Sequence, residues 1–113
     1  IKGWIEDGER KEVVVDVACS DGGEVDPDTN RCPDNGASVD LTTCATTRDL
    51  GARELSATWT DPDFDASQNA FYYVRVLENP KCRWPTLDAT RAGSPLNLDM
   101  HASIQDINWT SLI

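Results

Sequence analysis

The sequence has 113 residues, a length that predicts one domain with a single modest core. It carries 20 acidic and 10 basic residues, so the formal net charge is −10 at pH 7. Because phosphate groups bind to basic faces, this balance argues against nucleic acid and anionic membranes as partners. No apolar run approaches the ~20 residues of a membrane helix, so no membrane insertion is expected.

The start and the end of the chain both interrupt strand-like patterns. The first residue is Ile1 rather than Met, and the last residues, Leu112 and Ile113, lie in the middle of an apolar alternation. We therefore expect residues 1–113 to be a single all-β domain that is a C-terminal fragment of a larger protein.

The four cysteines predict disulfides rather than a zinc site. Cys19, Cys32, Cys44 and Cys82 contain no CxxC pair, and the single histidine, His101, stands alone. Disulfides imply an oxidising compartment, either periplasmic or extracellular. Four cysteines allow three pairings. We favour Cys19 with Cys32, which closes the polar loop between them, and Cys44 with Cys82.

The N-terminal third is expected to form a β-hairpin and then a long loop. Residues 1–6 are typical of a strand, Asp7-Gly8 begins a tight turn, and the alternating valines of residues 11–18 predict the partner strand. Residues 20–37 contain most of the turn formers and show no periodicity. This loop is long for a compact domain, and one of the proposed disulfides would pin it.

Two further strands are expected before residue 61. Residues 39–46 show a weak alternation that is typical of an edge strand. In residues 54–60, Leu55, Ala57 and Trp59 face one way while serine and threonine face the other. This pattern predicts a strand that is buried on one side only.

The run AFYYVRVL at residues 70–77 predicts the central strand. Its eight residues are mainly aromatic or β-branched, without glycine or proline, and turn formers lie on both sides. Such a strand is expected to be buried on at least one face. Its two faces would carry Tyr72, Val74 and Val76 on one side, and Phe71, Tyr73, Arg75 and Leu77 on the other.

The C-terminal part is expected to contain one helix and one strand. Residues 86–92 predict a helix of about two turns that Gly93 ends. Residues 107–112 predict the last strand. Many short strands with regular turns predict an antiparallel β-sandwich-like domain, with long disulfide-pinned loops and at most one short helix. We expect the core between its sheets to be filled by Trp4, Trp59 and Trp109.

Four motifs carry a resemblance to a known family. They are VACSDG at residues 17–22, VDPDTNRCPDNG at 25–36, ELSATWTDPDFD at 54–65 and AFYYVRVLENPKCRW at 70–84. Their order and spacing resemble the C-terminal part of a bacterial family of unknown function numbered 3604. That family is related to the polymerase-and-histidinol-phosphatase type of metal-dependent hydrolase. The resemblance implies a parent enzyme whose histidine and carboxylate metal ligands lie upstream of Ile1.

Two loops carry oxygen ligands at every second position and are candidate calcium sites. The ligands are Asp26, Asp28 and Asn30 in one loop, and Asp61, Asp63 and Asp65 in the other. That spacing resembles the first half of a calcium loop. Arg31 and Ala66 stand where such a loop has glycine, and no glutamate follows at the twelfth position. Turn capping by Asp and Asn is therefore the favoured interpretation. No catalytic or cofactor-binding residue and no other metal ligand is predicted.

The resemblance implies a non-catalytic C-terminal β domain of a secreted metal-dependent, phosphoesterase-like hydrolase, which packs on the catalytic domain or closes it. The partner would be the catalytic domain or a larger chain of the same precursor, and any divalent metal would be bound there. The alternative is a freestanding secreted interaction module, stabilised by calcium in its acidic loops. An exposed apolar patch at Phe71, Tyr73 and Leu77 would favour docking on the catalytic domain.

Overall fold

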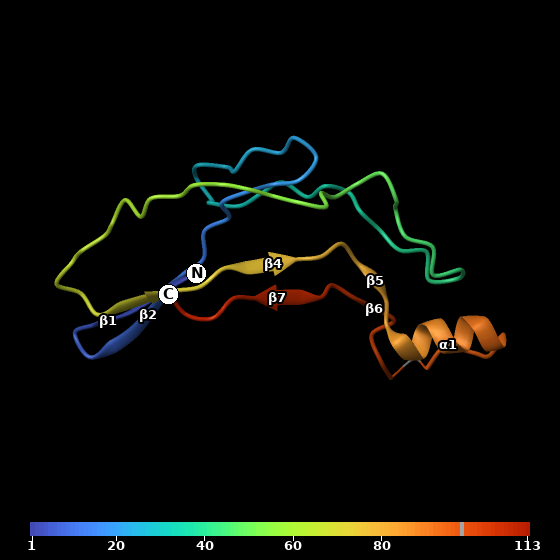
Figure 1. The fold of residues 1–113 in the computed structure, drawn as a ribbon. Coiled ribbons are helices and arrows are strands. Elements are labelled where there is room, and N and C mark those ends of the chain that lie inside the picture. The colour runs from blue at the N-terminus through green and yellow to red at the C-terminus, as the bar shows by residue number, and fades with distance from the viewer. Residues whose placement is uncertain (98) are drawn as a thin grey trace. The chain divides into compact units, whose positions relative to one another are not determined.

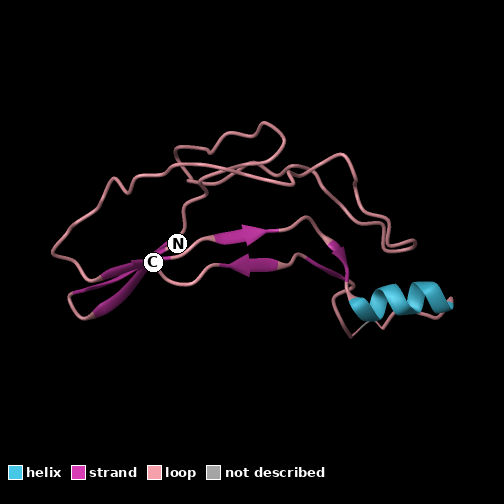
Figure 2. Ribbon diagram, viewed as in Figure 1, coloured by secondary structure: helices cyan, strands magenta, loops and turns pink. Residues whose placement is uncertain are grey.

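The computed structural model describes residues 1–97 and 99–113. In this part of the chain the strands form antiparallel sheets, with a single helix (Figures 1 and 2), as the all-β prediction requires. The strands are β1 (Lys2–Glu6), β2 (Glu9–Val13), β3 (Ala70–Tyr72), β4 (Arg75–Leu77), β5 (Lys81–Cys82), β6 (Ser103–Ile104) and β7 (Ile107–Trp109). The helix, α1, is Trp84–Ala92.

The chain divides into two compact units. Unit 1 consists of Ile1–Pro33, Ala52–Val76 and Asn108–Ile113, and unit 2 of Asp34–Gly51 and Leu77–Ile107. The assignment of the whole chain to one domain stays a prediction.

Unit 1 begins with the predicted hairpin. Strands β1 and β2 pair antiparallel with Glu6 opposite Glu9, so the connecting turn has two residues. These residues, Asp7 and Gly8, have φ angles of 51° and 77°. A two-residue turn with both φ angles positive matches the twist of a hairpin, which explains the Asp-Gly sequence.

The partner strand differs from the prediction of residues 11–18, because β2 starts at Glu9 and ends at Val13. Val13 lies opposite Lys2, so β1 has almost no residues left to pair with the later valines. The chain pairs with its own loop instead, where the amide of Asp16 donates to the carbonyl oxygen of Asn30 at 2.9 Å.

The predicted central strand is wrong as a single element, because it is divided into β3 and β4. Strand β3 pairs with β1 in the sheet order β2-β1-β3, while β4 pairs with β7. The change of partner falls at Tyr73, which exchanges two main-chain hydrogen bonds with Ile1. Val74 then bonds to Thr110. The expected buried face is also wrong, since Val74 and Val76 are 45% and 52% exposed.

Two other predicted strands are absent. Residues 39–46 form a tight turn, in which the amide of Cys44 donates to the carbonyl oxygen of Asp40 at 2.7 Å, and a single bridge joins Val39 to Thr46. Residues 54–60 are exposed and form no ladder. Their alternation predicted a buried face, but the side chain of Leu55 is 51% exposed.

The helix of unit 2 ends as predicted. Gly93 has φ 65° and its amide lies against the last helical carbonyl groups, a conformation that favours glycine. The helix starts two residues earlier than expected, at Trp84, because Pro85 occupies a first-turn position where its missing N–H costs nothing. Buried Thr86 donates its hydroxyl to the carbonyl oxygen of Ala102 at 2.8 Å.

No apolar side chain among the described residues is buried. The expectation that three tryptophans fill a core is therefore wrong. Trp4 is half-buried, Trp59 is exposed, and Trp109 is 70% exposed. The side chains that the chain does bury are polar, Lys2 and Thr86.

Candidate functional site

Lys2 is the most enclosed charged side chain in the described part of the chain, at 5% exposure. It projects from β1 and donates from Nζ to Asp61 Oδ2 at 2.7 Å and to the carbonyl oxygen of Asp63 at 3.0 Å. The ammonium also lies 5.4 Å from the ring centroid of Trp4 and 6.0 Å from that of Tyr72. Two oxygen acceptors and two aromatic rings together replace the water that this cation loses.

Asp61 accepts a second hydrogen bond at the same oxygen. The Tyr72 hydroxyl donates to Asp61 Oδ2 at 2.7 Å, while the amide of Asp63 donates to Oδ1 at 2.9 Å. The Asp61 side chain is 10% exposed. We call Lys2, Asp61 and Tyr72 the Lys2 cluster. It ties the turn after residue 60 to strands β1 and β3 of the three-stranded sheet.

The protonation states of the Lys2 cluster suit a structural role. The hydrogen bond from Lys2, followed by that from Tyr72, lowers the pKa of Asp61. The hydrogen bond to Asp61 raises the pKa of Lys2 and, with burial, that of Tyr72. A general acid or base works best with a pKa near the operating pH, and all three shifts lead away from neutrality. The cluster therefore binds and positions rather than transfers protons.

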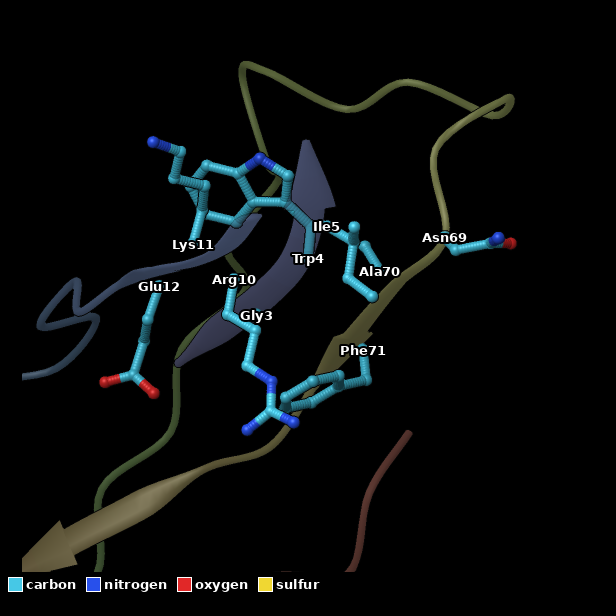
Figure 3. Close-up of a pocket in the computed structure, with 9 residues that line it drawn as sticks. All are labelled: Gly3, Trp4, Ile5, Arg10, Lys11, Glu12, Asn69, Ala70 and Phe71. Atoms are coloured by element: carbon cyan, nitrogen blue, oxygen red, sulfur yellow. The ribbon is translucent and has the colours of Figure 1, made fainter. Parts of the chain in front are cut away.

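An open groove of about 500 Å³ lies on the same three-stranded sheet (Figure 3). We call it the β1–β3 groove. Its apolar lining comes from Trp4, Ile5, Ala70 and Phe71, and its rim includes Arg10, Lys11, Glu12 and Asn69. Gly3 forms part of the lining, because the Phe71 ring lies directly against its main chain.

The first predicted calcium loop contains a self-capped turn. Asp26 Oδ1 accepts the amide of Asp28 at 2.8 Å and that of Thr29 at 3.4 Å, which lowers the Asp26 pKa. Asn30 has φ 56°, and its amide donates to the carbonyl oxygen of Asp26 at 2.8 Å. The Asp28 side chain is exposed. The carboxylate of Asp26 thus acts as the turn cap that the favoured interpretation expects.

The second predicted calcium loop divides its carboxylates between different partners. Asp61 belongs to the Lys2 cluster, Asp63 contributes its carbonyl oxygen to the same cation, and Asp65 Oδ1 accepts both the amide and the hydroxyl of Ser67. Within residues 1–97 and 99–113, no group of three or more His, Cys, Asp or Glu side chains could hold a metal ion. Calcium binding by either loop stays a prediction.

Both predicted disulfides are present. Cys19 is joined to Cys32 within unit 1, and Cys44 to Cys82 within unit 2, with Cα–Cα distances of 5.6 Å in each pair. The first disulfide lies beside Asp16, whose carboxylate accepts the amide of Cys32 at 2.7 Å and pairs with Arg31 at 3.2 Å. No cysteine thiol is free.

In unit 2, Asn79 connects two ends of the long loop before it. Its Oδ1 accepts a hydrogen bond from the side-chain amide of Asn35 at 3.1 Å, and its Nδ2 donates to the carbonyl oxygen of Leu50 at 3.0 Å. Its Asn-Pro context indicates a turn but does not indicate which segments the amide contacts.

Lys2, Tyr72 and Arg10 were not predicted as site residues from the sequence. One signal was available for Lys2: it stands two positions before Trp4, so both side chains share a face of β1. A lone cation beside an aromatic residue on a strand face needs an acidic partner if that face is covered. The partner itself, Asp61, is 59 residues away, and no local pattern identifies it.

Fold and site define a disulfide-bonded, all-β chain whose enclosed charges have structural partners and whose apolar side chains are largely exposed. The chain belongs to the family described as Protein of unknown function (DUF3604), whose model matches residues 1–113. Comparisons with curated proteins and with solved structures gave no match. Among the described residues, no helix is long and apolar enough to span a membrane.

Proposed function

We propose that this chain is the non-catalytic C-terminal β domain of a secreted metal-dependent hydrolase of the phosphoesterase-like type, and that it packs on the catalytic part or closes it. The observation that carries the proposal is the lack of a buried apolar side chain among the described residues. Apolar burial is the main favourable term in folding, so a chain with its apolar groups exposed needs a surface that covers them.

The exposed side chains indicate where the partner would pack in unit 1. Leu55, Trp59 and Phe64 lie in the segment before β3, and their side chains are 51%, 39% and 67% exposed. Of the three residues expected to form an exposed docking patch, Phe71 and Leu77 are 41% and 50% exposed and Tyr73 is half-buried.

The proposed secreted location is supported by the two disulfides. Both are expected to persist in the periplasm or outside the cell and to be reduced in the cytosol. The hydrolase partner is supported by the motif resemblance to a family related to such enzymes. In the proposed arrangement this chain supplies packing and closure, while the partner supplies the metal ligands.

The test is the mass of the protein from its natural source, first under native conditions and then after denaturation and reduction. We expect these residues within, or in a complex with, a much heavier polypeptide that contains bound divalent metal. Reduction should add the mass of four hydrogens for the two disulfides. A free species near 12.4 kDa would instead favour a freestanding interaction module.

Matched variants of the precursor locate the interface. Leu55→Ser and Phe64→Ser should increase hydrogen exchange of the catalytic part and lower its activity, because both side chains are exposed in this chain and covered in the proposed complex. Ser56→Ala, in the same exposed segment, is the control. Equal effects of all three substitutions would contradict apolar docking through this segment.

A further inference from the structure

The β1–β3 groove has a composition that the proposed packing role does not explain. Ile5, Arg10 and Phe71 project to the same side of the sheet, because Ile5 pairs with Arg10 and Phe71 pairs with Gly3, two residues before Ile5. Figure 3 shows the Arg10 side chain extending toward the Phe71 ring, and the Glu12 carboxylate extending away from it. A cation thus borders an apolar surface.

Arg10 has no carboxylate partner in the described part of the chain, although the sequence contains 20 acidic residues. Of the other cations of unit 1, Lys2 pairs with Asp61, Lys11 with Glu9 and Arg31 with Asp16, whereas Arg53 and Arg75 have no carboxylate partner among the described residues. Among the three arginines of unit 1 without such a partner, Arg10 is the one that lines the β1–β3 groove. The guanidinium is a rigid fork that matches a carboxylate in geometry, and its hydrogen bonds to carboxylates are stronger than those between neutral groups. The groove therefore presents a carboxylate receptor beside an apolar surface.

We propose that the β1–β3 groove binds an extended peptide segment in which an apolar side chain is followed by a carboxylate. The apolar side chain packs on Ile5 and Phe71, and the carboxylate accepts hydrogen bonds from Arg10. The proposal does not depend on the identity of the parent protein.

The shape of the groove favours a peptide over a small molecule. Its volume of about 500 Å³ accommodates side chains, but its lining remains open, with Ile5 59% exposed. Sites for small molecules usually enclose most of the ligand, which this surface does not do.

The local position of Gly3 makes this surface rigid. A Cβ at Gly3 would lie 2.4 Å from Cζ of Phe71, so the ring rests on the main chain of β1 without room to shift inward. A preformed apolar floor lowers the conformational cost of binding.

The test uses the oxidised chain labelled with ¹⁵N and two capped dipeptides, acetyl-Phe-Asp-amide and its neutral isostere acetyl-Phe-Asn-amide. We expect saturable shifts of the Ile5 and Phe71 amides and of Arg10 Nε–H, with the Asp peptide binding about tenfold more tightly because a charged acceptor strengthens the hydrogen bonds. Higher salt should reduce that difference.

Two variants distinguish the groove from general attraction to cations. Arg10→Gln should remove the preference for the Asp peptide and leave binding of the Asn peptide unchanged. Arg53→Gln, at an exposed arginine of unit 1 outside the groove, should leave both affinities unchanged. Dispersed amide signals in each variant confirm that the sheet is retained.

The following outcomes would overturn the proposal: absence of saturable shifts with either peptide, equal affinity for the two peptides, or equal loss of the preference in both arginine variants. A chain without dispersed amide signals has no preformed groove and would overturn it as well. None of these outcomes bears on the mass measurement that tests the proposed docking domain.

Discussion

At the scale of single residues, Gly3 shows how one contact fixes a strand register. Glycine in the interior of a strand weakens it, because it has a flexible backbone and no side chain to pack. Here the Phe71 ring covers the space that a side chain would occupy, and Gly3 lies opposite Phe71 in the ladder between β1 and β3. The ring substitutes for the missing side chain, and a shift of register would lose this contact.

Gly3→Ala is therefore expected to lower the free energy of unfolding by about 1–3 kcal/mol, the usual cost of forcing extra volume into a packed site. The added methyl group would lie 2.4 Å from Cζ of the Phe71 ring, so the ring must move. Urea unfolding followed by fluorescence measures the change.

The matched control is the same substitution in a Phe71→Ala background. Without the ring, Gly3→Ala should cost little, because nothing else in the structure fills this space as closely. A cost of similar size in both backgrounds would show that the ring contact is not the reason for the glycine.

Asp61 is the second residue whose environment predicts a measurable effect. Asp61→Asn should lower the thermal midpoint at pH 7 more than Asp28→Asn does, because it removes the charge that compensates the enclosed ammonium of Lys2, whereas the Asp28 side chain is exposed. The combined variant Lys2→Met/Asp61→Asn should recover part of the loss, since no uncompensated charge remains.

Thermal unfolding of the wild type and the three variants checks this expectation. An Asp61→Asn midpoint no lower than that of Asp28→Asn would mean that solvent, rather than Asp61, compensates Lys2. If Lys2→Met/Asp61→Asn is less stable than Asp61→Asn, then Lys2 and Asp61 stabilise the fold by more than the neutralisation of each other's charge.

At the scale of elements, the sequence predicted correctly those features that depend on a few neighbouring residues. It failed for strands whose burial depends on distant parts of the chain. The hairpin at Asp7-Gly8 and the helix end at Gly93 were predicted correctly, because both depend on positive φ angles at residues that favour them. The strands at residues 54–60 and 70–77 were predicted from alternation, which indicates what a strand can bury. Alternation does not show whether another layer is present to cover that face.

The two disulfides act as elements of their own, since they close loops of different length. Loop-closure entropy predicts that removal of Cys19–Cys32, with a separation of 13 residues, costs about 3 kcal/mol. Removal of Cys44–Cys82, with a separation of 38 residues, should cost about 4 kcal/mol. Both losses are large for a chain without buried apolar side chains in its described part.

Paired serine variants, Cys19→Ser/Cys32→Ser and Cys44→Ser/Cys82→Ser, allow the comparison in urea. The wild type with both bonds intact is the reference, and free-thiol titration confirms that the remaining disulfide has formed. If removal of Cys19–Cys32 lowers the free energy of unfolding more than removal of Cys44–Cys82, then native contacts outweigh loop-closure entropy. One such contact is the hydrogen bond from the Cys32 amide to Asp16.

At the scale of the whole molecule, the two disulfides were predictable from the sequence, whereas the Lys2 cluster and the β1–β3 groove were not. The number and spacing of the cysteines allowed the pairing to be proposed from the sequence. The Lys2 cluster and the β1–β3 groove depend on contacts between residues about 60 to 70 positions apart, and a single sequence has no signal for such pairs. The same limit explains why acidic residues that resemble calcium ligands accept hydrogen bonds from their own chain.

The distribution of shifted ionisable groups over the whole chain predicts its stability as a function of pH. Hydrogen bonds from the chain lower the pKa values of Asp26, Asp40, Asp61 and Asp65. Each such carboxylate stabilises the fold above its unfolded pKa of about 4, and this contribution is lost as the pH falls through the lower folded pKa.

The loss of stability at high pH arises from groups whose pKa values are raised rather than lowered. Hydrogen bonds to carboxylates raise the pKa values of Lys2, Lys81 and Tyr72, so their contributions are complete below unfolded values of about 10 and are lost as the pH rises through the folded ones. Thermal midpoints at constant ionic strength should therefore form a plateau from about pH 5 to 9. Asp61→Asn should lower the plateau and flatten both limits, because it removes one shifted acid and the partner of both Lys2 and Tyr72. Steepening of either limit in this variant would contradict the assigned hydrogen bonds.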